Sequence, residues 1–152
     1  MTILAYTKTC GPGMWSYVYF DQNGSMFRDY GAENFIHEDM RALRDRMSLI
    51  AVNKILDNLF AETFSQIEIV CDNNYIVSAL VNNDENICYP YNGYLSRWIQ
   101  EGLNKQTNGD LFDNLDKLLQ HHMFEMSNRI IIKSDDNCSS EIDELIEAVS
   151  RM

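Results

Sequence analysis

The sequence has little that would cross-link the chain or hold it in a membrane. Its four cysteines, Cys10, Cys71, Cys88 and Cys138, are widely spaced and form no CxxC pair. Neither a zinc site built from paired ligands nor a redox-active dithiol is therefore expected. No apolar run approaches the roughly 20 residues of a membrane span, and the N-terminus lacks the basic and apolar regions of a signal peptide. We expect a cytoplasmic protein with reduced thiols, and Cys71 inside a buried strand.

Positive charge is also scarce. Twelve Lys and Arg residues stand against 23 Asp and Glu residues, which gives a formal net charge of −11. Because proteins bind phosphate backbones through clustered Lys and Arg, this charge disfavours a nucleic-acid partner. The 152 residues, of which 45% are hydrophobic, suffice for one packed core. We expect residues 1–152 to form a single domain.

The N-terminal part of the chain has the residue pattern of strands. Residues 2–7, 14–20 and 25–31 are rich in aromatic and β-branched side chains, and an Asn-Gly turn at Asn23-Gly24 separates the second from the third. From Asp39 the apolar spacing changes to the helical period, which predicts a helix to about Glu62. The residues expected on its buried face are Met40, Leu43, Met47, Ile50 or Ala51, Ile55 and Leu59.

The rest of the chain alternates helix and strand. We predict strands at 65–71 and 128–133, helices at 73–81, at 94–103 and from Asn108, and a terminal helix after Ser139. Adjacent His121 and His122 cannot face one metal, and we interpret them as polar or cationic residues at a helix C-terminus. The order predicts a mixed α/β fold, with three antiparallel N-terminal strands in a five-stranded mixed sheet flanked by helices.

Five local motifs in this order resemble those of the ribonuclease H family. They are Tyr6-Thr7-Lys8-Thr9-Cys10 followed by Gly11-Pro12-Gly13, Arg46-Met47-Ser48-Leu49, Cys71-Asp72-Asn73-Asn74-Tyr75-Ile76-Val77, Asn108-Gly109-Asp110-Leu111-Phe112, and Ile142-Asp143-Glu144-Leu145-Ile146. The resemblance covers nearly the whole chain, with an apparent insertion around residues 83–91. It implies the ribonuclease H-like fold.

The resemblance also implies an acidic site that is only partly retained. In the family, four acids hold two Mg²⁺ ions about 4 Å apart, and these ions drive cleavage of the RNA strand of an RNA–DNA hybrid. Asp72 and Asp143 stand at two of the four positions, whereas Lys8 replaces the first-strand aspartate and Ser48 replaces the helix glutamate. An ammonium at position 8 would repel a dication and would pair with Asp72 and Asp143. The family's loop histidine is absent from residues 134–138.

Few nearby residues could compensate for these losses. Asp45 lies close to one turn before Ser48 and is the candidate replacement acid, whereas a shift that made Thr7 or Thr9 the first-strand equivalent would supply no carboxylate. Three residues stand where the family contacts nucleic acid. Asn73 and Asn74 could instead cap a helix, and Trp98 could instead pack against the core.

These observations leave three functional hypotheses. The first is a degenerate ribonuclease H-like domain without a metal cofactor, which binds protein and could self-associate through Tyr89, Tyr91 and Tyr94. The second is an active nuclease on RNA–DNA hybrids, with Mg²⁺ or Mn²⁺ at Asp72 and Asp143. The third is a non-catalytic nucleic-acid binder, which requires its basic residues to cluster on one face; these are Arg41, Arg44, Arg46, Lys54 and Lys133.

Overall fold

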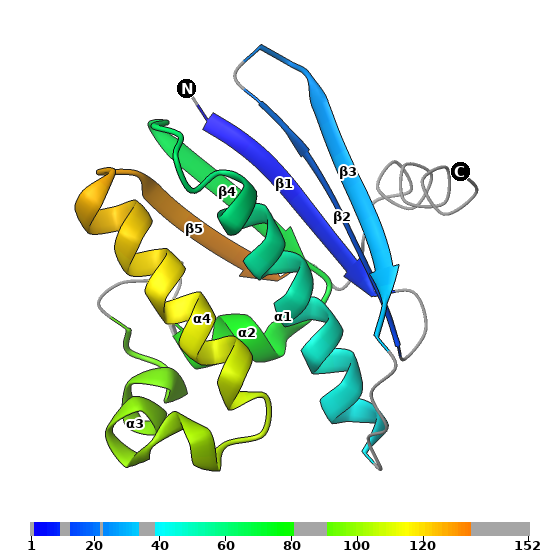
Figure 1. Ribbon diagram of the computed structural model, residues 1–152, viewed down its shortest axis with the longest axis vertical. Coiled ribbons are helices and arrows are strands. Elements are labelled where there is room, and N and C mark those ends of the chain that lie inside the picture. Colours follow the sequence, from blue (N-terminus) through cyan, green and yellow to red (C-terminus); the bar gives the residue numbers. More distant parts are fainter. Residues whose placement is uncertain (1, 10–12, 22, 34–38, 81–90, 135–152) are drawn as a thin grey trace.

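A five-stranded mixed sheet forms the centre of the computed structural model, which describes residues 2–9, 13–21, 23–33, 39–80 and 91–134. Its strand order is β3-β2-β1-β4-β5 (Figure 1). The antiparallel strands are β1 (Thr2–Thr9), β2 (Met14–Phe20) and β3 (Met26–Ala32), and the strands parallel to β1 are β4 (Gln66–Cys71) and β5 (Arg129–Ser134). The predicted fold class is confirmed.

The alternation of side chains in β1 gives the sheet two different faces. Ile3 and Ala5 are fully buried and belong to the core, and Thr7 and Thr9 continue the same buried series. The residues between them are only partly buried. Because successive side chains of a strand point to opposite faces, Lys8 lies on the face away from Thr7 and Thr9.

The hairpin between β2 and β3 closes through Asp21. Its side chain accepts hydrogen bonds from the backbone nitrogens of Asn23 (2.9 Å) and Ser25 (2.8 Å). Gly24 adopts a φ of +81°, which glycine adopts without a Cβ penalty. The predicted Asn-Gly turn is thus present, with glycine at the left-handed position.

The described helices are α1 (Met40–Asn58), α2 (Asn74–Leu80), α3 (Tyr94–Glu101) and α4 (Gly109–Gln120). Figure 1 shows α1 and α4 packed side by side across one face of the sheet. Asp39 caps α1 by accepting a hydrogen bond from the Arg41 nitrogen (2.9 Å).

Helix α1 ends earlier than the spacing of its apolar residues predicts. It ends at Asn58 rather than near Glu62, and the chain turns where the Phe60 nitrogen bonds the Asp57 carbonyl oxygen (3.1 Å). Asn58 donates to the Tyr17 hydroxyl (2.8 Å), which fixes this end of α1 to β2. Most predicted core residues of α1 are buried, but Met40 is 56% exposed because it is the first residue of the helix.

The adjacent histidines lie in a π-helical turn, residues 121–125, that continues α4. Their side chains have different partners: His121 Nε2 bonds the Phe60 carbonyl oxygen (2.6 Å), and His122 Nε2 bonds the Leu56 carbonyl oxygen (2.8 Å). His122 is completely buried, however, and desolvation lowers its pKa. Of the two alternatives predicted for this helix end, polar or cationic, the lowered pKa and the hydrogen bond between His122 Nε2 and the Leu56 carbonyl oxygen (2.8 Å) favour a polar, neutral His122.

Several sequence predictions fall on residues outside the described part of the chain. These are the terminal helix after Ser139, the insertion at residues 83–91 except its last residue, Tyr89, Asp143, Cys10, Cys88 and Cys138. Cys71, by contrast, is buried in β4 as predicted. No helix of the described ranges has the length and apolar character needed to cross a membrane.

Candidate functional site at the carboxyl ends of β1 and β4

Asp72 follows β4 directly and is held by the neighbouring strand. Its Oδ2 accepts hydrogen bonds from the backbone nitrogen of Thr9 (2.9 Å) and from the Thr9 hydroxyl (3.1 Å). The parallel pairing of β1 with β4 extends to Thr7 and Cys71, so the Asp72 side chain continues the hydrogen bonding where the backbone ladder stops. Thr9 is therefore the residue that orients this carboxylate, a role that the sequence did not indicate.

Lys8 lies on β1 between Thr7 and Thr9. Thr7 pairs with Cys71 at the end of the β1–β4 ladder, and Thr9 holds Asp72. Lys8 itself pairs with Ser16 of β2, whose hydroxyl donates to the Lys8 carbonyl oxygen (2.9 Å). The backbone of Lys8 is thus fixed to β2, at the strand position where the family resemblance expects an aspartate.

Helix α1 contributes Ser48 and Asp45 to this end of the sheet. Asp45 accepts a hydrogen bond from the Asn73 side chain (2.7 Å), so this face of α1 meets the segment after β4. Asn58 and Lys54 mark the face of α1 above β2, through contacts with Tyr17 and the Trp15 ring.

The direction of Ser48 follows from the helical period. Each residue advances about 100° around a helix, which places Ser48 between the face of Asp45 and the face of Lys54. Since β1 lies between β4 and β2, Ser48 faces β1. Its side chain is buried, with 1% of the residue exposed.

Three buried oxygens here have no hydrogen-bond partner among the residues that the structure describes. They are Thr7 Oγ1, Ser48 Oγ and Asp72 Oδ1. Unpartnered buried polar atoms are rare in proteins, because each costs about 1–3 kcal/mol. They belong to β1, α1 and the end of β4, the elements that meet at this end of the sheet. Local violations of this kind are typical of functional sites.

Asp45 is the second acid at the site. Burial is the main cause that raises its pKa, and the hydrogen bond from Asn73 opposes the shift. The helical spacing placed Asp45 on the same face of α1 as Ser48 but could not show which residue outside the helix it contacts. The contact that brings Asp45 to the end of β4 comes from Asn73, which lies 28 residues further along the chain.

The residues that the structure describes do not by themselves make up the ligand set of a two-metal centre. In the described part of the chain, no group of three or more His, Cys, Asp or Glu side chains could hold a metal ion. Of the three unpartnered oxygens, two are neutral hydroxyls, whereas hard divalent cations prefer several carboxylate oxygens. Asp143, the other acid that the resemblance indicates, lies outside the described residues.

The three candidate nucleic-acid contacts have structural roles. Asn73 accepts from the Tyr75 nitrogen (2.8 Å) at the start of α2, and Asn74 accepts from the Ser134 hydroxyl (3.1 Å). Trp98 is partly buried against the core and makes an edge-to-face contact with Phe112, with ring centroids 5.4 Å apart. The geometry therefore favours helix capping as the role of Asn73 and packing against the core as the role of Trp98.

Two of the five basic residues named for a nucleic-acid interface, Arg46 and Lys133, form ion pairs within the fold. Arg46 makes ion pairs with Glu33 (3.2 Å) and Asp110 (3.1 Å) that join the segment after β3, α1 and α4. Lys133 pairs with Glu68 (2.7 Å) on neighbouring strands. Both residues are thus neutralised within the fold, which weakens the hypothesis of a basic nucleic-acid interface.

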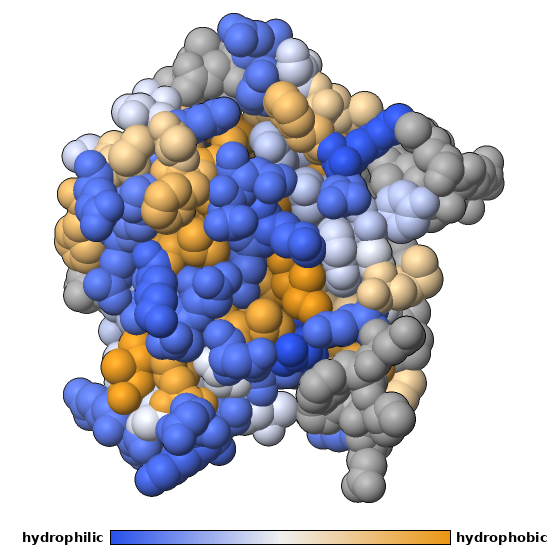
Figure 2. Space-filling view, viewed as in Figure 1, coloured by the Kyte–Doolittle hydropathy of each residue, from blue (hydrophilic) through white to orange (hydrophobic). Residues whose placement is uncertain are grey.

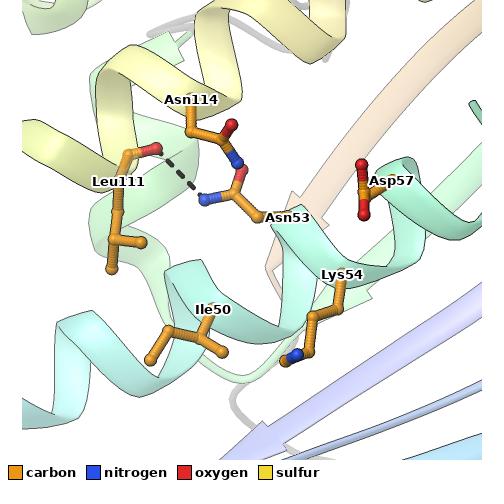
Figure 3. Close-up of a pocket in the computed structure, with 6 residues that line it drawn as sticks. All are labelled: Ile50, Asn53, Lys54, Asp57, Leu111 and Asn114. Atoms are coloured by element: carbon orange, nitrogen blue, oxygen red, sulfur yellow. Dashed lines mark hydrogen bonds between the residues drawn. The ribbon is translucent and has the colours of Figure 1, made fainter.

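The surface around α1 and α4 is predominantly polar, with apolar side chains visible between the elements (Figure 2). A groove between these two helices is lined by Ile50, Asn53, Lys54, Asp57, Leu111 and Asn114 (Figure 3). Asn53 donates to the Leu111 carbonyl oxygen (3.1 Å). These α1 residues lie on the faces directed toward α4 and β2, so the groove is separate from the site at Asp72.

Comparison with solved structures identifies the fold. The chain is similar to ribonuclease H1 of the halophilic archaeon Halobacterium salinarum, with a TM-score of 0.60, 14% identity and 100% of both chains covered. It is also similar to the N-terminal ribonuclease H domain of a Mycobacterium tuberculosis protein, solved as a fusion with maltose-binding protein. In that case the TM-score is 0.57, the identity is 9%, and 99% of this chain and 96% of that chain are covered. No family model and no curated protein sequence matches.

Proposed function

We propose that this chain, which has a ribonuclease H-like fold, has lost two-metal nuclease activity and acts as a binding or assembly module. The observation that carries the proposal is the lysine at position 8 of β1, which directly follows Thr7, the partner of Cys71 in the last β1–β4 pair, and directly precedes Thr9, which holds Asp72. A cation of the protein then stands where a catalytic site of this type would need a carboxylate to bind a metal ion. No metal cofactor is required for this function.

The helix position supports the same conclusion. Ser48 offers a buried hydroxyl in place of a carboxylate. The carboxylate of Asp72 is in turn committed through Oδ2 to Thr9. The retained acid therefore has a structural role in joining β1 to β4, which would preserve Asp72 in the absence of catalysis.

A protein is the partner class that fits the surface best. The net charge of −11 opposes phosphate binding, and Arg46 and Lys133 are engaged in ion pairs. Among the aromatics predicted to mediate self-association, Tyr94 is 54% exposed and stacks on Trp98. Tyr91 is only partly buried, but its hydroxyl donates to Asp116, so it contributes to packing rather than to an exposed patch.

The decisive test is a cleavage assay on a labelled RNA–DNA hybrid with Mg²⁺ or Mn²⁺. We expect no cleavage by the natural sequence, and activity when Lys8→Asp and Ser48→Glu restore both acids. Lys54→Asp with Ser96→Glu changes the charge equally at half-exposed or exposed helix positions and serves as the control. Cleavage by the natural protein that Asp72→Asn abolishes would refute the proposal.

One observation favours the alternative, an active ribonuclease H with a modified metal site. Asn73 brings the carboxylate of Asp45 to the end of β4, so α1 does present an acid near Asp72. With Asp143, these residues would hold Mg²⁺ or Mn²⁺ for cleavage of RNA–DNA hybrids. Under this alternative, Mg²⁺ raises the melting temperature of the natural protein, and Asp45→Asn or Asp72→Asn removes that increase. Under the preferred proposal, Mg²⁺ does not change the melting temperature.

A further inference from the structure

The chain contains three Asn-Gly pairs, Asn23-Gly24, Asn92-Gly93 and Asn108-Gly109. Such pairs are chemically labile because glycine has no side chain to hinder the approach of its nitrogen to the preceding carboxamide. Ring closure requires the glycine nitrogen to reach Cγ of the asparagine, so both residues must change conformation. The packing around each glycine therefore determines whether the reaction is possible in the folded protein.

Asn108 and Gly109 are held tightly at the start of α4. Asn108 is 7% exposed, and its Nδ2 donates to the Ala42 carbonyl oxygen (3.0 Å). The position of a Cβ at Gly109 lies only 1.8 Å from the Leu103 carbonyl oxygen. Neither the carboxamide nor the glycine can move without separating α4 from α1.

Gly93 is also confined, although Asn92 is exposed. A Cβ at Gly93 would lie 2.4 Å from the Ser78 carbonyl oxygen, and its nitrogen donates to the Leu80 carbonyl oxygen (3.2 Å). Gly93 is thus wedged against the end of α2 at the first turn of α3. Local movement here requires α3 to leave α2.

Gly24 differs from the other two glycines. No atom lies within 4 Å of its Cβ position, and Asn23 is exposed at the hairpin tip. Its nitrogen donates to the carbonyl oxygen of Asp21 (3.1 Å), within the same loop. Opening this loop disturbs no helix and no core residue, and exposed loop tips open at low free energy.

We propose that Asn23 is a site of spontaneous deamidation, and that the fold protects Asn92 and Asn108 from the same reaction. The Gly24 nitrogen loses its proton to water and attacks Cγ of Asn23. The new C–N bond closes a succinimide ring, and the bond to the side-chain nitrogen breaks to release ammonia. Water then opens the ring to aspartate or isoaspartate.

The product changes the hairpin in a defined way. Aspartate adds one negative charge beside Asp21, whose carboxylate already holds the nitrogens of Asn23 and Ser25. Isoaspartate also inserts a methylene group into the backbone between these two hydrogen-bonded nitrogens. The inference does not depend on the proposed function.

The test compares deamidation in the folded and in the unfolded protein. The full chain is incubated in warm, mildly alkaline buffer with or without concentrated urea, then digested and analysed by mass spectrometry. We expect Asn23 to react at similar rates in both conditions, and Asn92 and Asn108 to react at least about ten-fold more slowly in buffer than in urea. Equal protection of all three sites, or faster reaction at Asn108 than at Asn23 in the folded protein, would overturn the proposal.

Two variants test whether Asn23 is the reacting residue, through the negative charge that deamidation adds to the protein. In native isoelectric focusing, the natural protein should develop an acidic variant with time. Asn23→Gln should remove most of this variant, because glutamine would need a less favourable six-membered ring, and Asn92→Gln should leave it unchanged. Persistence of the acidic variant in Asn23→Gln would contradict the proposal.

Discussion

The two ends of β4 carry buried polar clusters of opposite character. Before β4, Asn128 accepts from the Phe64 nitrogen (2.9 Å) and donates to the Glu62 carbonyl oxygen (2.9 Å) and to His122 Nδ1 (3.1 Å). The His122 Nε2–H donates to the Leu56 carbonyl oxygen (2.8 Å). At the other end of β4, Thr7 Oγ1, Ser48 Oγ and Asp72 Oδ1 have no hydrogen-bond partner among the described residues.

The difference is between a hydrogen-bond network whose described polar groups have partners and a cluster with three oxygens that have none among the described residues. A complete network stabilises the fold because every buried donor and acceptor is satisfied. An incomplete one destabilises it, because its buried oxygens lose their hydrogen bonds to water without gaining others. Substitutions in the two clusters should therefore change the free energy of unfolding in opposite directions.

The largest expected effect is at Asn128. Asn128→Ala leaves the Phe64 nitrogen, the Glu62 carbonyl oxygen and His122 Nδ1 without their partner, and should lower the free energy of unfolding by about 3 kcal/mol. Urea denaturation measures it. Asn114→Ala, at an exposed position on α4, serves as the control and should change the value by less than about 0.5 kcal/mol. Equal effects of the two substitutions would show that the network contributes little.

The next effect is the pH dependence that His122 confers. Burial lowers its pKa below the ordinary 6.5, so the unfolded state binds more protons near that pH. Its contribution to stability is fully present above pH 6.5 and is lost as the pH falls toward the lower pKa of the folded state. The loss amounts to about 1.4 kcal/mol for each unit of the shift.

Denaturation at a series of pH values tests this prediction. A plot of the free energy of unfolding against pH has a slope below pH 6.5 to which His122 contributes. His122→Phe should remove that contribution, although the variant should be less stable than the natural protein at every pH. His121→Phe provides the comparison at the neighbouring position of the same turn. An unchanged slope in His122→Phe would assign the acid sensitivity to other groups.

A smaller effect of opposite sign is expected at the other end of β4. Thr7→Val replaces an unpartnered hydroxyl with a methyl group of similar shape, and Ser48→Ala removes one. Each should leave the free energy of unfolding unchanged or raise it by up to about 1 kcal/mol. Thr9→Val is the matched control, because it breaks the bond to Asp72 and should destabilise. Destabilisation by Thr7→Val equal to that by Thr9→Val would contradict the comparison.

The smallest expected effect is at Asp45. Its pKa is raised, so its contribution to stability is present below the ordinary value of 3.8 and is lost as the pH rises through the folded-state pKa. Asp45→Asn keeps an acceptor for Asn73 and should raise stability slightly at neutral pH. Exposed Asp57→Asn is the control for general charge repulsion. A marked loss of stability in Asp45→Asn would mean that the charge of Asp45 has a partner at the site.

Much of the fold could be predicted because it depends on local patterns. The predicted strand ranges agree with the structure to within two residues. Alternating buried and partly buried residues mark β1, and buried aromatic residues mark β2, and both patterns arise from burial on a sheet. The predicted end of α1 near Glu62 was wrong, because the apolar spacing continues past Asn58, where the helix ends. The predicted burial of Met40 was also wrong, because it is the first residue of the helix. The packing role of Trp98 was one of two alternatives, and its edge-to-face contact with Phe112, which favours packing, could not be foreseen from the sequence.

The sequence by itself determined the residue types at the site, with lysine and serine at positions where the resemblance implies acids, and the net charge of −11. Tertiary structure alone decided that Thr9 holds Asp72, that Asn73 brings Asp45 to the same end of the sheet, and that the Cβ position of Gly24 is open while those of Gly93 and Gly109 are blocked. The physical reason is that local spacing sets which face of an element a side chain occupies. Hydrogen-bond partners and packing limits, by contrast, depend on residues far away along the chain.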